Sequence, residues 1–103
     1  YNLKNLEHLI LRDNKLKELK SDYFYHLKKL KSLDLFGNEI QAINKDTFSY
    51  LKSLEFLNLC SNSLNFIEDN SFSDLKNLKK IYLNYNLIKK LTSEIFNGLY
   101  SLE

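Results

Sequence analysis

The chain has little of what rigid or crosslinked small proteins depend on. Its 103 residues include one cysteine, two glycines and no proline, methionine or tryptophan. A single cysteine cannot form an internal disulfide, which excludes a disulfide-stapled miniprotein. No apolar run reaches the roughly 18 residues that a membrane-spanning helix needs, which excludes such a helix within this stretch. The net charge of +2, from 15 basic and 13 acidic residues, argues against a polyanion as the main partner.

What the sequence has instead is a repeat. Apolar residues recur with a period of 24 and no insertion or deletion, in units 6–29, 30–53, 54–77 and 78–101. The second unit places them at Leu30, Leu33, Leu35, Ile40, Ile43, Phe48 and Leu51, and the fourth ends on Leu91, Phe96 and Leu99. One asparagine holds the same slot throughout, as Asn14, Asn38, Asn62 and Asn86. Leu3 and Leu102 are also in register, so we expect residues 1–103 to be an internal fragment of a longer array without caps.

The spacing has a direct physical interpretation. The Leu-x-Leu triplet alternates with period 2, which predicts a short strand with one buried face. One unit cannot bury that face alone, so successive units are expected to stack their strands into a parallel sheet. An asparagine amide offers donors and an acceptor, which suits it to bond backbone groups where each strand ends. The phenylalanines are expected to fill the far side of the core, and the strands to lie on the inside of the curve.

The pattern LxxLxLxxNxLxxLxxxxFxxLxxL resembles the leucine-rich repeat family over nearly the whole chain. The 24-residue length and the FxxLxxL tail resemble the subtype of animal extracellular proteins such as Toll-like receptors. The resemblance implies an α/β-type leucine-rich-repeat solenoid, a right-handed curved array. Short parallel strands would line its concave face, with irregular or short helical return segments on the convex side.

Once the core positions are assigned, the solvent side of the predicted sheet shares no residue type between units. The predicted partner-binding residues there are His8, Ile10, Arg12, Asp34, Phe36, Phe56, Asn58, Lys80, Tyr82, Asn84 and Tyr85. Aromatic anchors flanked by charges are typical of protein interfaces, although single exposed aromatics are also ordinary. We therefore predict a non-enzymatic recognition module whose concave face binds a protein ligand or a glycoconjugate. The alternatives are an intracellular scaffold or sensor segment with its effector domain elsewhere, or a segment that only spaces distant sites.

Charges ahead of the predicted strands alternate in sign, in the order Glu7, Lys31, Glu55 and Lys79. This order predicts a ladder of ion pairs between neighbouring coils, worth roughly 0 to 1 kcal/mol each. Its role is expected to be structural.

Catalytic and metal sites are weakly supported. His8 and Ser32 are predicted to be neighbours with Asp34 on the same face, but Asp34 is not placed behind the imidazole and no oxyanion site is predicted. The soft ligands His8, His26 and Cys60 have no metal-ligand spacing. We predict no enzyme activity, no metal and no cofactor, and interpret Cys60 as a partly exposed free thiol.

The return segments carry Lys28, Lys29, Lys52, Lys76, Lys89 and Lys90, interleaved with Asp22, Asp46, Glu68, Asp69, Asp74 and Glu94. Because these charges largely cancel, we predict neither nucleic-acid binding nor membrane contact by this segment. The subtype implies an extracellular or cell-surface location. The lack of an N-x-S/T sequon and the unpaired cysteine leave a cytoplasmic location as the alternative.

Overall fold

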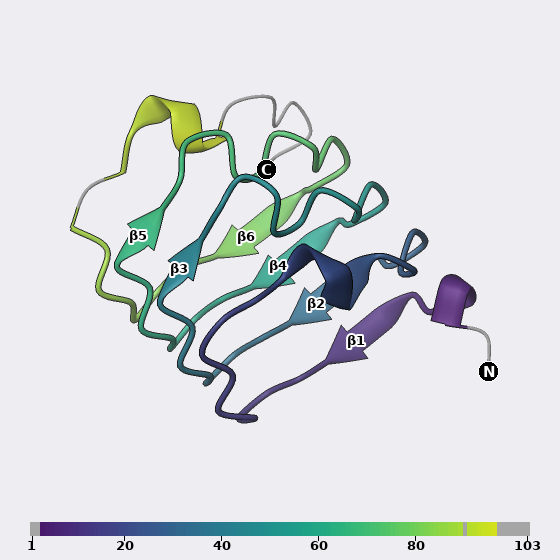
Figure 1. Ribbon diagram of the computed structural model, residues 1–103, viewed down its shortest axis with the longest axis horizontal. Helices are drawn as coiled ribbons and strands as arrows, with labels where there is room; N and C mark the ends of the chain where they lie inside the picture. The colour runs from purple at the N-terminus through teal and green to yellow at the C-terminus, as the bar shows by residue number, and fades with distance from the viewer. Residues whose placement is uncertain (1–2, 90, 97–103) are drawn as a thin grey trace.

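The computed structural model describes residues 3–89 and 91–96, which wind through four stacked coils (Figure 1). Each coil gives one strand to a parallel sheet: β1 (His8–Ile10), β2 (Ser32–Asp34), β4 (Phe56–Asn58) and β6 (Lys80–Tyr82). The register follows the repeat, with Leu9 opposite Leu33 and Leu33 opposite Leu57. The predicted parallel sheet is therefore confirmed. No helix in the described ranges is long and apolar enough to cross a membrane.

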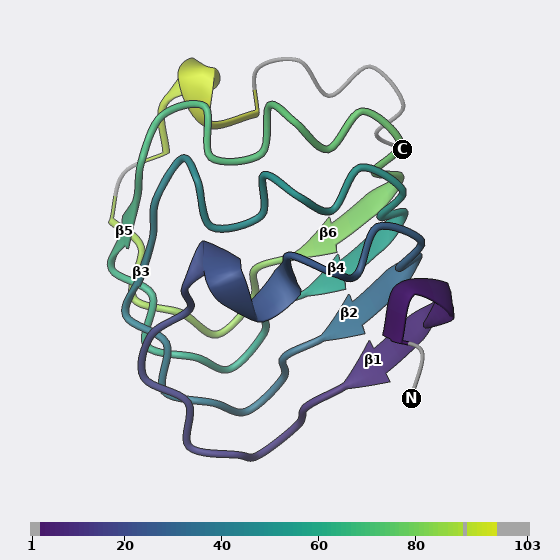
Figure 2. The ribbon, with the colours of Figure 1, turned by 45° about the vertical axis from the view of Figure 1, so that its right-hand side comes forward.

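The return segments are irregular, as expected, with a few short elements. Figure 2 shows the large sheet on one side of the coils and the return segments on the other. Short 3-10 turns in the described residues are η1 (Leu3–Asn5), η2 (Ser21–Phe24) and η3 (Ser93–Phe96). A second parallel sheet joins β3 (Ala42–Ile43) to β5 (Phe66–Ile67). This two-stranded sheet was not predicted, because two residues are too few for an alternating pattern to show.

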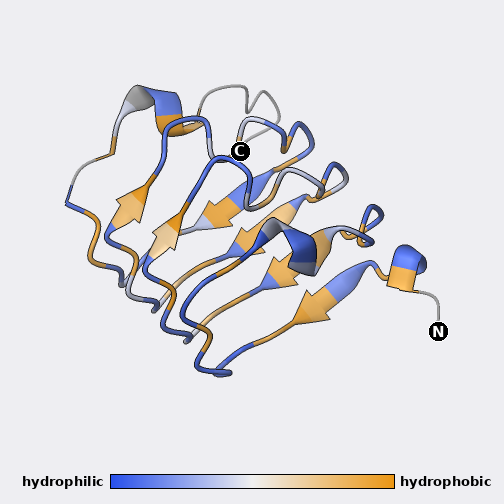
Figure 3. Ribbon diagram, viewed as in Figure 1, coloured by the Kyte–Doolittle hydropathy of each residue, from blue (hydrophilic) through white to orange (hydrophobic). Residues whose placement is uncertain are grey.

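The buried apolar positions of the described residues form one continuous core, and every strand carries apolar residues (Figure 3). All of the predicted apolar positions in the second and third coils are buried. The end coils are less well covered, since each packs against one described neighbour. Their partly buried side chains are Leu6, Leu9, Leu11, Leu16, Ile81, Leu83, Ile88 and Phe96.

One core prediction is wrong. Leu91, in the last described coil, is 53% exposed, although Leu19 in the same slot of the first coil is buried. Ile95, which the repeat pattern did not assign to the core, is buried instead. It occupies the slot that Thr47 and Ser71 fill in the preceding coils, where both are also buried. The predicted core residue Leu99 and the in-register Leu102 lie outside the described residues.

A stack of phenylalanine rings explains the curvature. Ring centroids of Phe24 and Phe48 lie 5.9 Å apart, and those of Phe48 and Phe72, and of Phe72 and Phe96, lie 6.1 Å apart. Paired strands are spaced by about 4.8 Å. The coils are therefore further apart at the phenylalanines than at the four-stranded sheet. This difference places the sheet on the concave side.

Asparagine side chains join each coil to the one before it. Asn62 Oδ1 accepts the N–H of Ile40 at 3.1 Å, from the preceding coil. Its Nδ2 donates to the carbonyl of Leu35 in that coil at 3.0 Å and to that of Leu59 in its own coil at 3.1 Å. Asn38 and Asn86 make the equivalent bonds. The predicted role of the repeated asparagine is confirmed at these three positions.

A left-handed residue follows each strand by three positions. Asp13, Gly37, Ser61 and Tyr85 have φ of 56°, 75°, 56° and 61°. This conformation turns the chain sharply away from the sheet, and glycine adopts it most easily. At Gly37 a Cβ would also meet the carboxylate of Asp13, whose exposed side chain would have to move. The turn was not predicted, because three of the four residues are not glycine.

The predicted ladder of ion pairs is discontinuous. Glu7 and Lys31 approach to 4.0 Å, and Glu55 and Lys79 to 3.8 Å. Within the described ranges Lys31 and Glu55 form no ion pair, so the prediction of a full ladder is wrong. Lys31 has a single ammonium group, which lies toward Glu7. These side chains are about half exposed, so each pair contributes roughly 0 to 1 kcal/mol.

We predict that Asn62→Ala lowers the free energy of unfolding by about 2 kcal/mol. The buried N–H of Ile40 would lose its acceptor, at a cost of about 1 to 3 kcal/mol, whereas the carbonyls of Leu35 and Leu59 keep a second asparagine. The control is Asn14→Ala, which removes one exposed bond to the carbonyl of Arg12 and should cost under about 1 kcal/mol. Denaturant unfolding measures both, and equal losses would contradict the assignment.

We predict that Phe48→Ala costs about 3 to 5 kcal/mol of unfolding free energy. It removes a fully buried ring from between two others and leaves a cavity. The matched control is Phe66→Ala, since Phe66 is 55% exposed. The melting temperature should fall far more for Phe48→Ala, and an unchanged value would refute the core assignment.

Candidate binding surface

We define the sheet face as the outward-facing residues of β1, β2, β4 and β6 together with the second and third residues that follow each strand. The strand register aligns one column as His8, Ser32, Phe56 and Lys80, and a second as Ile10, Asp34, Asn58 and Tyr82. The residues between the columns, Leu9, Leu33, Leu57 and Ile81, point into the core, because side chains alternate along a strand. The predicted site residues therefore lie on one continuous face.

Arg12 is held in place by two neighbours on the sheet face. Its Nε donates to Asp34 Oδ2 at 2.7 Å, and its guanidinium lies 4.8 Å from the centroid of the Phe36 ring. Asp34 Oδ1 in turn accepts the backbone N–H of Phe36 at 3.1 Å. An arginine fixed in this way loses less side-chain entropy on binding. Its other N–H donors find no acceptor among the described residues.

The aromatic centre of the face lies across β4 and β6. The rings of Phe56 and Tyr82 meet edge to face, with centroids 5.3 Å apart and planes at 69°. Tyr82 is 40% exposed, and Phe56 is half-buried. Ile10 and Tyr85 are more exposed, at 69% and 82%. The sheet face thus offers large apolar side chains to solvent although the core does not need them.

His8 and Ser32 meet as the register predicts, with His8 Nδ1 2.8 Å from Ser32 Oγ. The third member of a catalytic triad is not in place, since the Asp34 carboxylate bonds Arg12 and the Phe36 backbone. A triad carboxylate has to orient the imidazole. The contact therefore joins two strands without the geometry of a nucleophilic site. Within residues 3–89 and 91–96 no group of three or more potential ligands is arranged for a metal.

Asn58 departs from the predicted arrangement. We expected its side chain to face solvent, but it is buried, 9% exposed, and its Oδ1 accepts the N–H of Cys60 at 2.9 Å. Asp34 makes the same bond two residues ahead, to Phe36. Both are short side chains that satisfy the backbone as it leaves the strand. This role was not predicted from the sequence. The signal that indicates it is a short acidic or amide residue between two core leucines.

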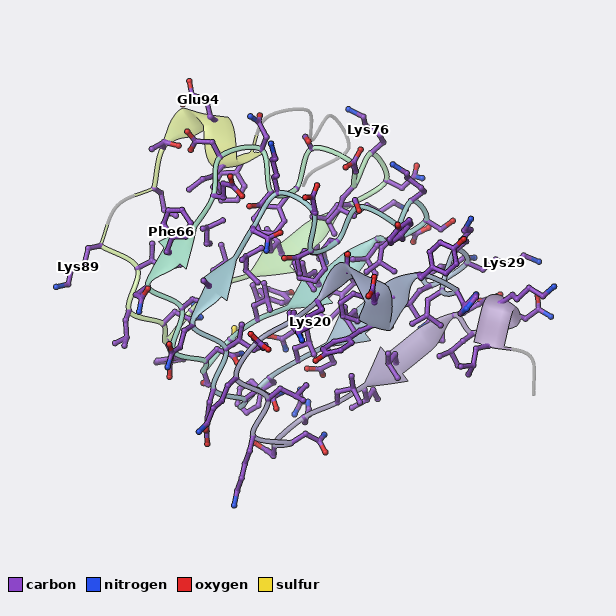
Figure 4. All side chains as sticks on the ribbon, in the orientation of Figure 1. Lys20, Lys29, Phe66, Lys76, Lys89 and Glu94 are labelled. Atoms are coloured by element: carbon purple, nitrogen blue, oxygen red, sulfur yellow. The ribbon has the colours of Figure 1, made fainter. Side chains whose placement is uncertain are left out.

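The remaining predicted residues lie at the edge of the sheet face. Lys80 and Asn84 are exposed and belong to the fourth coil. Cys60 is a free, half-buried thiol between the second and fourth coils. A hollow of about 580 Å³ lies away from this face, over β5, and is lined in part by Phe66 and Lys89. Figure 4 shows both side chains on the return side. The sheet face itself is broad and open.

Comparisons with known proteins agree with this architecture. A crystal structure of TLR13 in complex with ssRNA13 matches with a TM-score of 0.90 and 34% identity, over 96% of this chain and 14% of that chain. The Toll–Spatzle complex of Drosophila development and innate immunity matches with a TM-score of 0.83 and 28% identity, over 95% and 14%. The chain thus spans about a seventh of these two relatives. No curated protein sequence matches it.

The family comparison covers almost the entire sequence. The sequence model described as leucine rich repeat matches residues 4–64 and 57–103. The predicted fold class, a right-handed curved solenoid with its parallel strands on the concave face, is confirmed by the sheet and by these relatives. The chain belongs to the leucine-rich repeat family.

Proposed function

We propose that this chain is a non-enzymatic recognition segment whose sheet face binds a protein ligand. The observation that carries the proposal is the contrast between two sets of positions in the same coils. Interior positions repeat Leu, Ile, Phe and Asn, whereas sheet-face positions differ in every coil. The scaffold does not require exposed Ile10, Tyr82 or Tyr85. An open surface with aromatic anchors and a fixed arginine matches the composition of protein interfaces.

The relatives support a ligand-binding role, and they add nucleic acid to protein as a possible class of ligand. Toll is found in complex with a protein, Spatzle, and TLR13 in complex with ssRNA. The exclusion of nucleic acid, which rested on charge balance, therefore does not hold across the family. For this chain we favour a protein ligand, since the sheet face pairs Arg12 with Asp34 and carries no array of free cations within the described residues.

A receptor ectodomain or a secreted protein is the setting that we propose, with an intracellular scaffold as the alternative. The repeat subtype and the likeness to Toll and TLR13 support it. The intact polypeptide that contains this chain tests the location. A cleaved signal peptide, read by mass spectrometry of the mature N-terminus, would support it, and an uncleaved cytoplasmic form would contradict it.

We predict that Phe36→Ala and Tyr82→Ala each weaken ligand binding by about 1 to 3 kcal/mol and leave the fold intact. The ligand is to be found by screening an oligomerised form of the chain against a library of extracellular proteins, with surface plasmon resonance for affinities. Tyr23→Ala is the control, because Tyr23 is 52% exposed on η2, off the sheet face. A ligand that binds both sheet-face variants as tightly as the parent chain would refute the proposal.

A single-stranded RNA oligonucleotide provides the competing test. At about 150 mM salt we expect no saturable binding, because the net charge is +2 and the sheet-face arginine is neutralised by Asp34. Fluorescence anisotropy measures this. Saturable binding that disappears in Tyr82→Ala would assign the sheet face to RNA in place of protein.

A further inference from the structure

A second candidate site lies off the sheet face, between η1 and the segment that joins η2 to β2. A hollow of about 390 Å³ is lined by Lys4, Tyr25, His26, Lys28 and Lys29. Lys4 belongs to η1, and the other four follow η2. Figure 4 shows Lys29 beside η1, at the end of the array where the first coil lies. Three lysines therefore line one hollow, and none of its lining residues in the described part of the chain carries a carboxylate.

The next coil shows why this hollow keeps its charge. Lys52 occupies the slot of Lys28 one repeat later, and its ammonium bonds Asp74 at 3.1 Å. The slot of Asp74 in the preceding repeat is held by Tyr50. Asp74 thus neutralises Lys52, whereas Tyr50, in the equivalent position, offers no carboxylate to Lys28. Charge cancellation, expected for the whole return side, fails at Lys28.

Near Lys28, aromatic rings lie where the next coil has a carboxylate. The Lys28 ammonium lies 5.6 Å from the centroid of the Tyr25 ring. Tyr25 is itself fixed edge to face against Tyr50, with centroids 4.9 Å apart, and against His26 at 4.8 Å. The Lys29 ammonium donates to the neutral Asn5 Oδ1 at 3.2 Å. In the described ranges, Lys4, Lys28 and Lys29 form no ion pair.

We propose that this hollow binds a sulfate or phosphate group carried on a sugar ring. The three ammonium groups supply charge-assisted hydrogen bonds to a tetrahedral oxyanion. The fixed Tyr25 ring supplies an apolar wall against which a sugar ring packs. The site is independent of the sheet face, so a protein ligand and an anionic saccharide would bind to different sides of the solenoid.

The test is an NMR titration of the full chain, residues 1–103, at low salt, which follows the ring signals of Tyr25 and His26. The probes are a sulfated heparin disaccharide, its desulfated form and ribose 5-phosphate. We expect saturable shifts with the sulfated or the phosphorylated probe and none with the desulfated one. Whichever of the first two binds more tightly identifies the source of the oxyanion. The absence of saturable shifts with both would overturn the proposal.

Variants distinguish specific binding in the hollow from nonspecific attraction of the anion to surface lysines. The double variant Lys28→Ala, Lys29→Ala should weaken binding about tenfold or more, because it removes two charge-assisted hydrogen bonds. Lys52→Ala is the matched control, since it removes one lysine that is already neutralised, and it should leave the affinity within about twofold. Equal losses in the two variants would show attraction to net charge only and would overturn the site.

Tyr50→Asp provides the opposite change, because it gives the first pair of coils the carboxylate that the next pair has. We expect the new carboxylate to pair with Lys28 and to weaken probe binding about tenfold. Asp74 shows that an aspartate is accommodated in this slot. The melting temperature reports whether the fold is kept, and undiminished binding by a folded Tyr50→Asp chain would contradict the proposal.

Discussion

The hydrogen bonds from asparagine side chains to backbone groups of two successive coils are the interaction on which the solenoid depends. The carbonyl of Leu35 receives Nδ2 of both Asn38 and Asn62, and that of Leu59 receives both Asn62 and Asn86. Beyond each strand the chain turns through a left-handed residue, and its backbone groups leave the ladder of the sheet. Buried groups of this kind need partners. One asparagine amide bonds a backbone N–H and two backbone carbonyls from two successive coils, and this fixes how the coils stack.

Because leucines, phenylalanines and asparagines hold the coils together from within, many positions on the outer surfaces are not needed for packing. The sheet face uses this freedom for Phe56, Tyr82 and an arginine restrained by Asp34 and Phe36. The first coil uses it differently, with lysines around a fixed tyrosine. The ligand that a stacked array binds then depends on the residue that each coil places in a given surface column, while the scaffold remains the same.

The sequence predicts the interior well because burial repeats every 24 residues and each apolar slot of the repeat pattern takes either Phe or a Leu or Ile of similar size. It predicts the outer surface less well, for reasons that are local. Asn58 was expected in solvent but its Oδ1 accepts the backbone N–H of Cys60. Leu91 was expected in the core, but it is 53% exposed at the end of the described stack. The open charge at Lys28 depends on Tyr50, 22 positions away in another coil.

Hydrogen exchange of single amides tests the role of asparagine most directly. The N–H groups of Leu16, Ile40 and Leu64 donate to Asn38, Asn62 and Asn86, and the bond of Ile40 is the buried one of the three. The account predicts strong protection at all three amides and the slowest exchange at Ile40, measured by NMR in deuterium oxide. Exchange at Ile40 as fast as at an exposed amide would contradict it.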